Sequence, residues 1–141
     1  MTRIHLELKE QVLLLRSGIP VTNFEIINVP YLMEGHFMRT IAVGPKYLPV
    51  LVLTHGYCSS SILYYPIIEG LTKHFRVILF DLPGMGGSSR PEFKVSNHLE
   101  AIDFFVSAFE AWRDLLQITD FILGGHSLGA YLSGCYASRF P

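Results

Sequence analysis

The sequence has little charge of either sign and no long hydrophobic run. Charged residues make up only 16% of the 141 residues, the formal net charge is −1, and the 11 Lys and Arg are scattered. Binding to nucleic acid needs a basic patch, so we expect no nucleic-acid partner. No apolar stretch approaches the ~20 residues that a membrane-spanning helix needs. The N-terminus also lacks the pattern of a secretory signal, so we expect a soluble cytoplasmic protein.

Cysteine is scarce as well. The chain has two cysteines, Cys58 and Cys135, and they form neither a disulfide framework nor the ligand spacing of a zinc site. We expect both to be small, buried, hydrophobic residues in a reducing compartment. We expect no metal ion and no cofactor.

Apolar residues, by contrast, make up half of the chain, which is typical of an α/β fold whose central strands are buried on both faces. The apolar runs and turn signals predict five strands, over residues 24–29, 36–44, 48–56, 76–81 and 120–125. Helical patterns follow the last three strands, over residues 59–75, 97–118 and 128–140. Strands that alternate with helices in this way predict a mostly parallel sheet with helices on both faces.

The N-terminal residues 3–16 are expected to form an amphipathic helix that ends near Gly18 and Pro20. Its apolar stripe consists of Ile4, Leu8, Val12 and Leu15. In the longer helix over 97–118, apolar and aromatic residues recur on one face, and we expect that face to pack in the core.

One motif points to chemistry. Gly125-His126-Ser127-Leu128-Gly129 has the pattern Gly-x-Ser-x-Gly and lies between a predicted strand and a predicted helix. In that context the chain turns so sharply that the serine side chain is presented as a nucleophile. Gly125 and Gly129 would let the neighbouring chain pack closely, without Cβ clashes.

A nucleophilic serine also needs donors for the oxyanion of the tetrahedral intermediate. The backbone N–H of Leu128 lies at the start of the predicted helix, where the helix dipole favours negative charge. A second donor is expected from the loop that follows the strand over 48–56. His55 and Gly56, at the end of that strand, support the turn, and the N–H of Tyr57 is the best candidate.

At these motifs the sequence resembles the N-terminal half of an α/β-hydrolase. "LTHGYCSSS", "FDLPGMGGSSRP" and "GGHSLGAYLSGCYASRFP" occur in the order and spacing of that superfamily. From residue 105 to the end, and along the Gly84–Pro91 loop, the chain is most similar to the α/β-hydrolase-domain proteins four and five of lipid metabolism. The resemblance divides the chain into an N-terminal helical segment, 1–22, and the N-terminal part of a hydrolase domain, 23–141.

Carried over residue by residue, the resemblance makes Ser127 the nucleophile and the amides of Tyr57 and Leu128 the oxyanion hole. His126 then occupies the variable position of the motif. Some members of the branch have lost the serine and act as lipase coactivators, but this sequence keeps it. Others carry a His-x-x-x-x-Asp motif that is linked to acylation of lysophosphatidate, and that motif would lie beyond residue 141.

The two partners of the serine are missing from the sequence. In this family the acid and the histidine follow the nucleophile, yet none of the 14 residues after Ser127 is His, Asp or Glu. Upstream, His55 is expected to be structural, and Asp81 is expected to order the glycine-rich loop. We therefore expect the chain to be a fragment, truncated after the nucleophile helix and nearly inactive alone.

The sequence thus predicts a serine hydrolase that acts on carboxylic esters, with lipid acyl esters such as lysophospholipids implied by the resemblance. The same resemblance implies contact with a lipid-droplet or membrane surface. Two alternatives stay open: a non-catalytic protein of the hydrolase fold, such as a lipase coactivator or scaffold, and a lysophosphatidate acyltransferase. We call the turn over residues 125–129 the nucleophile elbow. A serine at its centre argues against the epoxide hydrolases and dehalogenases of this fold, which use Asp there.

Overall fold

The structure is a computed structural model, and it describes residues 3–31 and 34–141. It contains a sheet of five strands, β1 (Phe24–Pro30), β2 (Phe37–Val43), β3 (Val50–Thr54), β4 (Arg76–Phe80) and β5 (Phe121–Gly125). Its α-helices are α1 (Arg3–Arg16), α2 (Tyr65–Thr72), α3 (His98–Leu115) and α4 (Leu128–Arg139), and short 3₁₀ turns span Val21–Asn23 and Ser61–Tyr64. All five predicted strands are confirmed, with ends that differ by up to two residues.

The strand order is β1-β2-β4-β3-β5. The hairpin of β1 and β2 is antiparallel, β2 joins β4 antiparallel, and β3 lies parallel to both β4 and β5. The predicted α/β fold class, a mostly parallel sheet covered by helices, is therefore confirmed. Strand β5 pairs with β3 and, within the described residues, with no other strand, so the sheet ends there.

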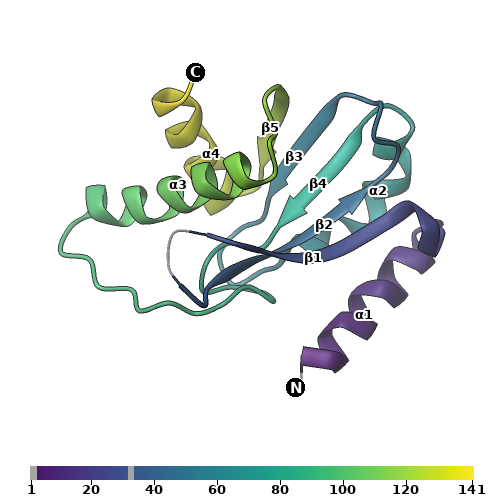
Figure 1. Ribbon diagram of the computed structural model, residues 1–141, viewed down its shortest axis with the longest axis horizontal. Coiled ribbons are helices and arrows are strands. Elements are labelled where there is room, and N and C mark those ends of the chain that lie inside the picture. Colours follow the sequence, from purple (N-terminus) through teal and green to yellow (C-terminus); the bar gives the residue numbers. More distant parts are fainter. Residues whose placement is uncertain (1–2, 32–33) are drawn as a thin grey trace.

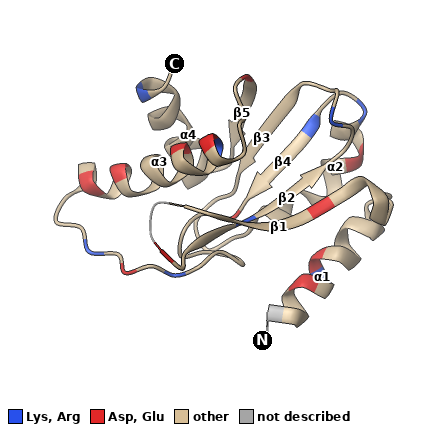
Figure 2. Ribbon diagram, in the orientation of Figure 1, with Lys and Arg blue, Asp and Glu red and all other residues tan. Residues whose placement is uncertain are grey.

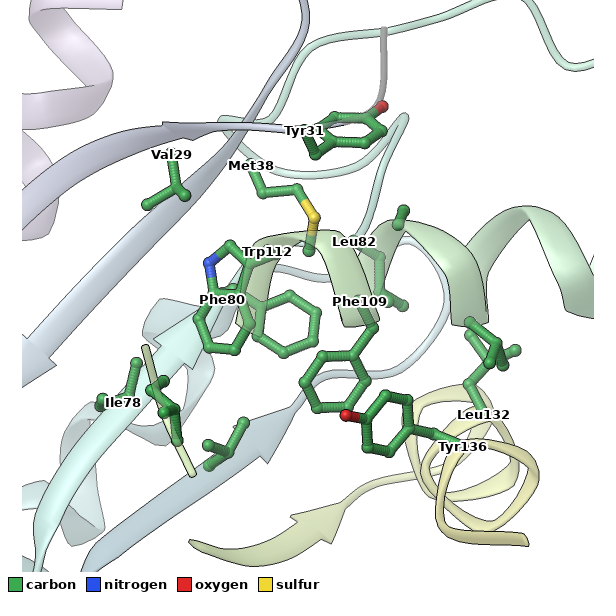
Figure 3. Close-up of a cluster of buried hydrophobic side chains, with 14 of the residues drawn as sticks. Val29, Tyr31, Met38, Ile78, Phe80, Leu82, Phe109, Trp112, Leu132 and Tyr136 are labelled. Atoms are coloured by element: carbon green, nitrogen blue, oxygen red, sulfur yellow. The ribbon is translucent and has the colours of Figure 1, made fainter. Parts of the chain in front are cut away.

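Helices cover both faces of the sheet (Figure 1). Along β4 the side chains alternate between the two sides: Ile78 and Phe80 face α3 and α4, while Val77 and Leu79 face α1 and α2. The α3 side is rich in aromatic rings, as Figure 3 shows. There Tyr136 of α4 stacks on Phe109 of α3, with ring centroids 4.1 Å apart.

Helix α3 begins where the sequence predicts. The Asn97 side chain accepts hydrogen bonds from the N–H groups of Leu99 and Glu100, each at 3.0 Å, and so caps the helix. Trp112 on its inner face is fully buried, and its indole N–H donates to Thr40 of β2 at 2.8 Å. The aromatic face of this helix is confirmed as core packing.

The helix expected over residues 59–75 is wrong at both ends. The first part is the 3₁₀ turn Ser61–Tyr64, and the α-helix starts only at Tyr65. Pro66 explains the start, because a proline without an N–H is tolerated in the first turn of an α-helix and not in its interior.

The face on which α1 packs also differs from the expectation. Its buried residues are Glu10 and Leu14, whereas Ile4, Leu8, Val12 and Leu15 are 47–71% exposed. The cause is Arg39 of β2, which is buried and donates from Nε and Nη2 to the Glu10 carboxylate at 3.1 and 2.7 Å. A buried guanidinium without a partner is costly, so the helix turns its acidic face inward. Burial raises the pKa of Glu10 despite the opposing effect of Arg39.

The cysteine expectation is wrong for Cys58, which is exposed in the loop after β3. Cys135 on α4 is half-buried, and both thiols are free. Charged side chains are dispersed over several elements, as Figure 2 shows. None of the described helices is both long and apolar enough to cross a bilayer.

Candidate active site

The site is built at the junction of β5 and α4. Ser127 occupies this turn with φ +54° and ψ −122°, a conformation that costs an L-residue about 1–3 kcal/mol. Three backbone hydrogen bonds hold the turn: His126 N–H to the Thr54 carbonyl at 3.0 Å, Gly129 N–H to the His126 carbonyl at 3.0 Å, and Tyr131 N–H to the Ser127 carbonyl at 3.1 Å. The junction is therefore a sharp strand-to-helix turn with the serine at its apex.

The two motif glycines lie where the chain crosses itself. A Cβ on Gly129 would approach the carbonyl oxygen and carbon of Thr54 to 2.5 and 2.7 Å. A Cβ on Gly125 would lie 2.7 Å from the backbone nitrogen of Ala130. These neighbours are backbone atoms, which cannot swing aside as a flexible side chain can. Glycine at both positions thus allows α4 to pack directly on the end of β3.

The loop after β3 lies against the serine. A Cβ on Gly56 would be 3.2 Å from both the Cβ of Ser127 and Nδ1 of His126. Within the described part of the chain, the N–H groups of Tyr57 and Leu128 donate to no acceptor. Two unpaired amides therefore flank the serine, as an oxyanion hole requires. The catalytic roles of Ser127, Tyr57 and Leu128 stay predictions.

His55 is fully buried beneath this loop, and both of its ring nitrogens are occupied. Leu82 N–H donates to Nε2 at 3.0 Å, so Nε2 carries no proton, and Nδ1 lies 2.7 Å from the Gly56 carbonyl, to which it donates. The Asp81 carboxylate is 3.9 Å from Nε2. Because Nε2 already accepts a hydrogen bond, this approach is not an ion pair. The ring connects the loop after β3 to the loop after β4.

Asp81 orders the glycine-rich loop, as the sequence predicts. Its two carboxylate oxygens accept hydrogen bonds from Ser61 N–H and Gly87 N–H, both at 2.6 Å. Gly86 has φ +49°, and a Cβ there would fall on the Asp81 carboxylate. The carboxylate thus holds two loops together, and both of its oxygens are occupied by these hydrogen bonds.

Sequence reasoning missed the residues that fix the end of β3. The Thr54 hydroxyl lies 2.9 Å from the hydroxyl of Ser133 on α4, and the Tyr64 hydroxyl donates to the Thr54 carbonyl at 2.8 Å. Burial raises the pKa of Tyr64, which keeps its phenol a donor. The signal available in the sequence was Thr54, a polar residue that ends an apolar strand directly before His55.

A pocket of about 1100 Å³ opens beside the serine. The residues that carry the two unpaired amides, Tyr57 and Leu128, line it, and its walls are otherwise mostly apolar. The apolar lining comes from α1, the 3₁₀ turn, the loop after β4 and α3, and includes Leu6, Leu13, Ile62, Met85, Phe93 and Phe105. A cavity of this size and character suits an acyl chain.

The site lacks a base in contact with the serine. The Ser127 hydroxyl has no hydrogen-bond partner among the residues that the structure describes. His55 is occupied, as shown above, and residues 3–31 and 34–141 contain no group of three His, Cys, Asp or Glu placed to hold a metal ion. The described arrangement thus offers two unpaired amides and a largely apolar pocket beside the serine, and no base in contact with its hydroxyl.

Known proteins resemble the chain in both sequence and structure. The family described as "alpha/beta hydrolase fold" matches residues 49–141. A 1-acylglycerol-3-phosphate O-acyltransferase of Arabidopsis thaliana is 38% identical over 77% of the chain and 26% of its own length. A (lyso)-N-acylphosphatidylethanolamine lipase of Mus musculus is 36% identical over 72% of the chain and 30% of its own length.

Among solved structures, a bacterial membrane phospholipase A superposes with a TM-score of 0.76 at 20% identity. The match covers 99% of the chain and 40% of that structure, and it bears on the fold alone. The chain spans 26% and 30% of the length of the two curated relatives described above.

Proposed function

Because the chain belongs to the alpha/beta hydrolase fold family, we propose that Ser127 is the nucleophile of a serine hydrolase that cleaves carboxylic esters of lipids. The observation that carries the proposal is the backbone of Ser127, strained at φ +54° between two unpaired amides and beside a largely apolar pocket. Strain of this kind persists only where the surrounding contacts hold the backbone in that conformation, and it is concentrated at functional sites.

The proposed reaction combines this geometry with a histidine from outside the described residues. Ser127 Oγ attacks the acyl carbonyl carbon while a histidine takes the hydroxyl proton, and the amides of Tyr57 and Leu128 hold the resulting oxyanion. When the tetrahedral intermediate collapses, the ester C–O bond breaks and the leaving alcohol receives that proton. Water then attacks the acyl-enzyme in the same way, which releases a carboxylic acid and restores the serine. Each oxyanion donor contributes about 3 kcal/mol to such a step.

The histidine and its acid partner are proposed to come from a part of the protein that follows residue 141. In this proposal, residues 23–141 are the N-terminal part of a hydrolase domain, and residues 1–22 are a helical segment in front of it. A serine without a base is a weak nucleophile, so the 141 residues alone are expected to have almost no turnover.

The lipid substrate is supported by the pocket and by the names of the relatives. The pocket walls are apolar over most of their area. The two relatives described above are named for a lysophosphatidate-type acceptor and for an acylated phosphatidylethanolamine. We take a lysophospholipid as the substrate class. The acyltransferase name also supports a second candidate activity, in which a lysophosphatidate hydroxyl replaces water in the second step.

Contact with a membrane or lipid-droplet surface is part of the proposal. The exposed stripe of α1, formed by Ile4, Leu8, Val12 and Leu15, is apolar, while Leu6 and Leu13 on the same helix line the pocket. The acidic side chains of α1 turn toward Arg39, and Lys9 and Arg16 remain exposed near the stripe. An apolar stripe beside basic residues is typical of a helix that lies in an anionic lipid interface.

Labelling of the full-length protein with a fluorophosphonate probe tests the nucleophile. We expect the wild type to be labelled and Ser127→Ala to lose the adduct completely. Ser138→Ala removes an exposed serine from the same helix and should label like the wild type. A folded wild type that takes up no label would overturn the proposal. With a labelled enzyme, release of fatty acid or transfer to lysophosphatidate then separates the two activities.

A further inference from the structure

The apolar pocket has one charged residue in its lining. Of the residues that line it, Arg90 alone carries a charge, and the others are apolar, hydroxyl-bearing or glycine. Arg90 lies on the loop after β4, across from the loop that carries the amide of Tyr57. Arg90 is itself exposed, but hydrogen bonds hold its guanidinium at the pocket lining, so a single oriented cation in a mostly apolar pocket needs an explanation.

The guanidinium is held in place but not neutralised. Nη1 donates to the Ser88 carbonyl and Nη2 to the Gly86 carbonyl, both at 3.1 Å. Within the described residues, no carboxylate forms an ion pair with Arg90. A guanidinium has five N–H donors, so about three remain for a ligand. The two carbonyls therefore orient a positive charge whose anionic partner is not supplied by the described chain.

Hydroxyl groups lie next to this cation. Ser59 and Ser60 line the same pocket, and neither hydroxyl has a partner among the residues described. Ser60 is adjacent to Gly86: a Cβ on Gly86 would lie 2.9 Å from the Ser60 Cβ, and the Gly86 carbonyl is one of the two that bind Arg90. The two loops thus bring a guanidinium and an unpaired hydroxyl to either side of one glycine.

We infer that Arg90, with Ser60 and Ser59, binds the phosphate group of the lipid substrate. Arginine matches phosphate oxygens with a planar fork of donors, and serine hydroxyls complete such a site. Ser60 is three residues after Tyr57, so a phosphate there lies within about 10 Å of the proposed oxyanion amide. That separation suits a phosphate and an acyl ester on one glycerol. The site selects a phosphate-bearing acylglycerol over the neutral ester.

This inference rests on the proposed function, and a comparison of two substrates tests it. We would measure kcat/KM of the full-length protein for a lysophosphatidate and for the monoacylglycerol with the same acyl chain. Arg90→Gln is expected to lower kcat/KM about 10- to 100-fold for the lysophosphatidate, since a hydrogen bond to a charged group is lost. For the monoacylglycerol the change should stay within about threefold. Ser60→Ala should give a smaller loss with the same preference.

Two controls make the result specific. Lys94→Gln removes one positive charge from the same loop outside this pocket, and it should leave both rates unchanged. Arg90→Lys keeps the charge without the fork and should recover part of the lysophosphatidate rate. An equal loss on both substrates would overturn the inference, because Arg90 would then only support its loop. An unchanged substrate ratio would also overturn it.

Failure of the proposed function has a different signature. In that case the wild type would cleave neither substrate and would take up no fluorophosphonate. If the wild type is labelled and cleaves the monoacylglycerol, but Arg90→Gln keeps the wild-type ratio, then only the phosphate site is wrong. Should Arg90→Gln fail to fold, the ratio for Ser60→Ala and for Arg90→Lys still decides the question.

Discussion

Adding one methyl group at Gly129 should disrupt the elbow, and the same change at Gly134 should not. In Gly129→Ala the new Cβ would lie 2.5 Å from the Thr54 carbonyl oxygen, and ordinary van der Waals contact begins at 3.4 Å. Helix α4 must therefore move from β3 by about 1 Å. A gap of this size forfeits a quarter to a half of each affected contact. Such overpacking costs about 3 kcal/mol when both sides are backbone.

Gly134 is the matched control. It lies in the same helix, and an added Cβ would meet nothing within 4 Å. Replacement of glycine by alanine inside a helix gains about 1 kcal/mol. We therefore expect Gly134→Ala to be about 1 kcal/mol more stable than the wild type. Gly129→Ala, which has the same helical gain but also the overpacking, should be about 2 kcal/mol less stable.

Urea unfolding of the full-length protein, followed by circular dichroism, measures both free energies. The fluorophosphonate labelling rate gives a second readout, because a nucleophile displaced by 1 Å can lose about a hundredfold in rate. We expect Gly129→Ala to label about a hundredfold more slowly and Gly134→Ala to label normally. If both variants unfold at the same urea concentration, the close approach of α4 to Thr54 is refuted.

Further substitutions test the glycine-rich loop, the packing of α1 and the proposed lipid contact. Gly86→Ala adds a methyl onto the Asp81 carboxylate and should cost at least about 2 kcal/mol in thermal unfolding; Gly84→Ala, also at positive φ but in open space, should cost about 1 kcal/mol. Glu10→Ala removes the nearest carboxylate from buried Arg39, which keeps only Asn28 and the more distant Glu7 among the described side chains, and should cost about 3 kcal/mol by urea unfolding. Because burial raises the pKa of Glu10 in the folded state, the stability that this group contributes is complete below pH 4.5 and is lost as the pH rises to the pKa of the folded state. The wild type should therefore lose stability relative to Glu10→Gln as the pH rises above 4.5. A difference in stability that does not change with pH would contradict the raised pKa. Leu8→Ser should weaken binding to phosphatidylserine vesicles about tenfold without changing hydrolysis of a soluble ester, and unchanged flotation would contradict the lipid contact.

The sequence was most informative where structure is decided locally. The strands around the site are continuous apolar runs, so their positions could be predicted to within two residues. The elbow was equally predictable, because the two glycines and the serine act within one strand-to-helix junction. Even the capping of α3 by Asn97 follows from residues only two and three positions away.

Contacts between distant segments were not predictable in the same way. The apolar stripe of α1 pointed to one packing face, but Arg39 lies 29 residues after Glu10 and reverses the choice. A periodic pattern identifies an amphipathic helix without saying which face a buried charge on another element will require. Cys58 was expected to be buried on composition alone, and its exposed place depends on how the loop after β3 lies over the sheet.

The supports of the elbow all lie within the described chain, and this has a consequence for catalysis. The strain at Ser127 costs about 1–3 kcal/mol. It is opposed by the bond from His126 N–H to the Thr54 carbonyl and by the packing of Gly129 on β3. Asp81 and His55 fix the loops that follow β3 and β4, so neither side chain is free to act on the serine. The shape of the elbow therefore does not depend on the acid and the histidine that we propose for the rest of the protein. Loss of those groups would remove the base and leave the two unpaired amides in place.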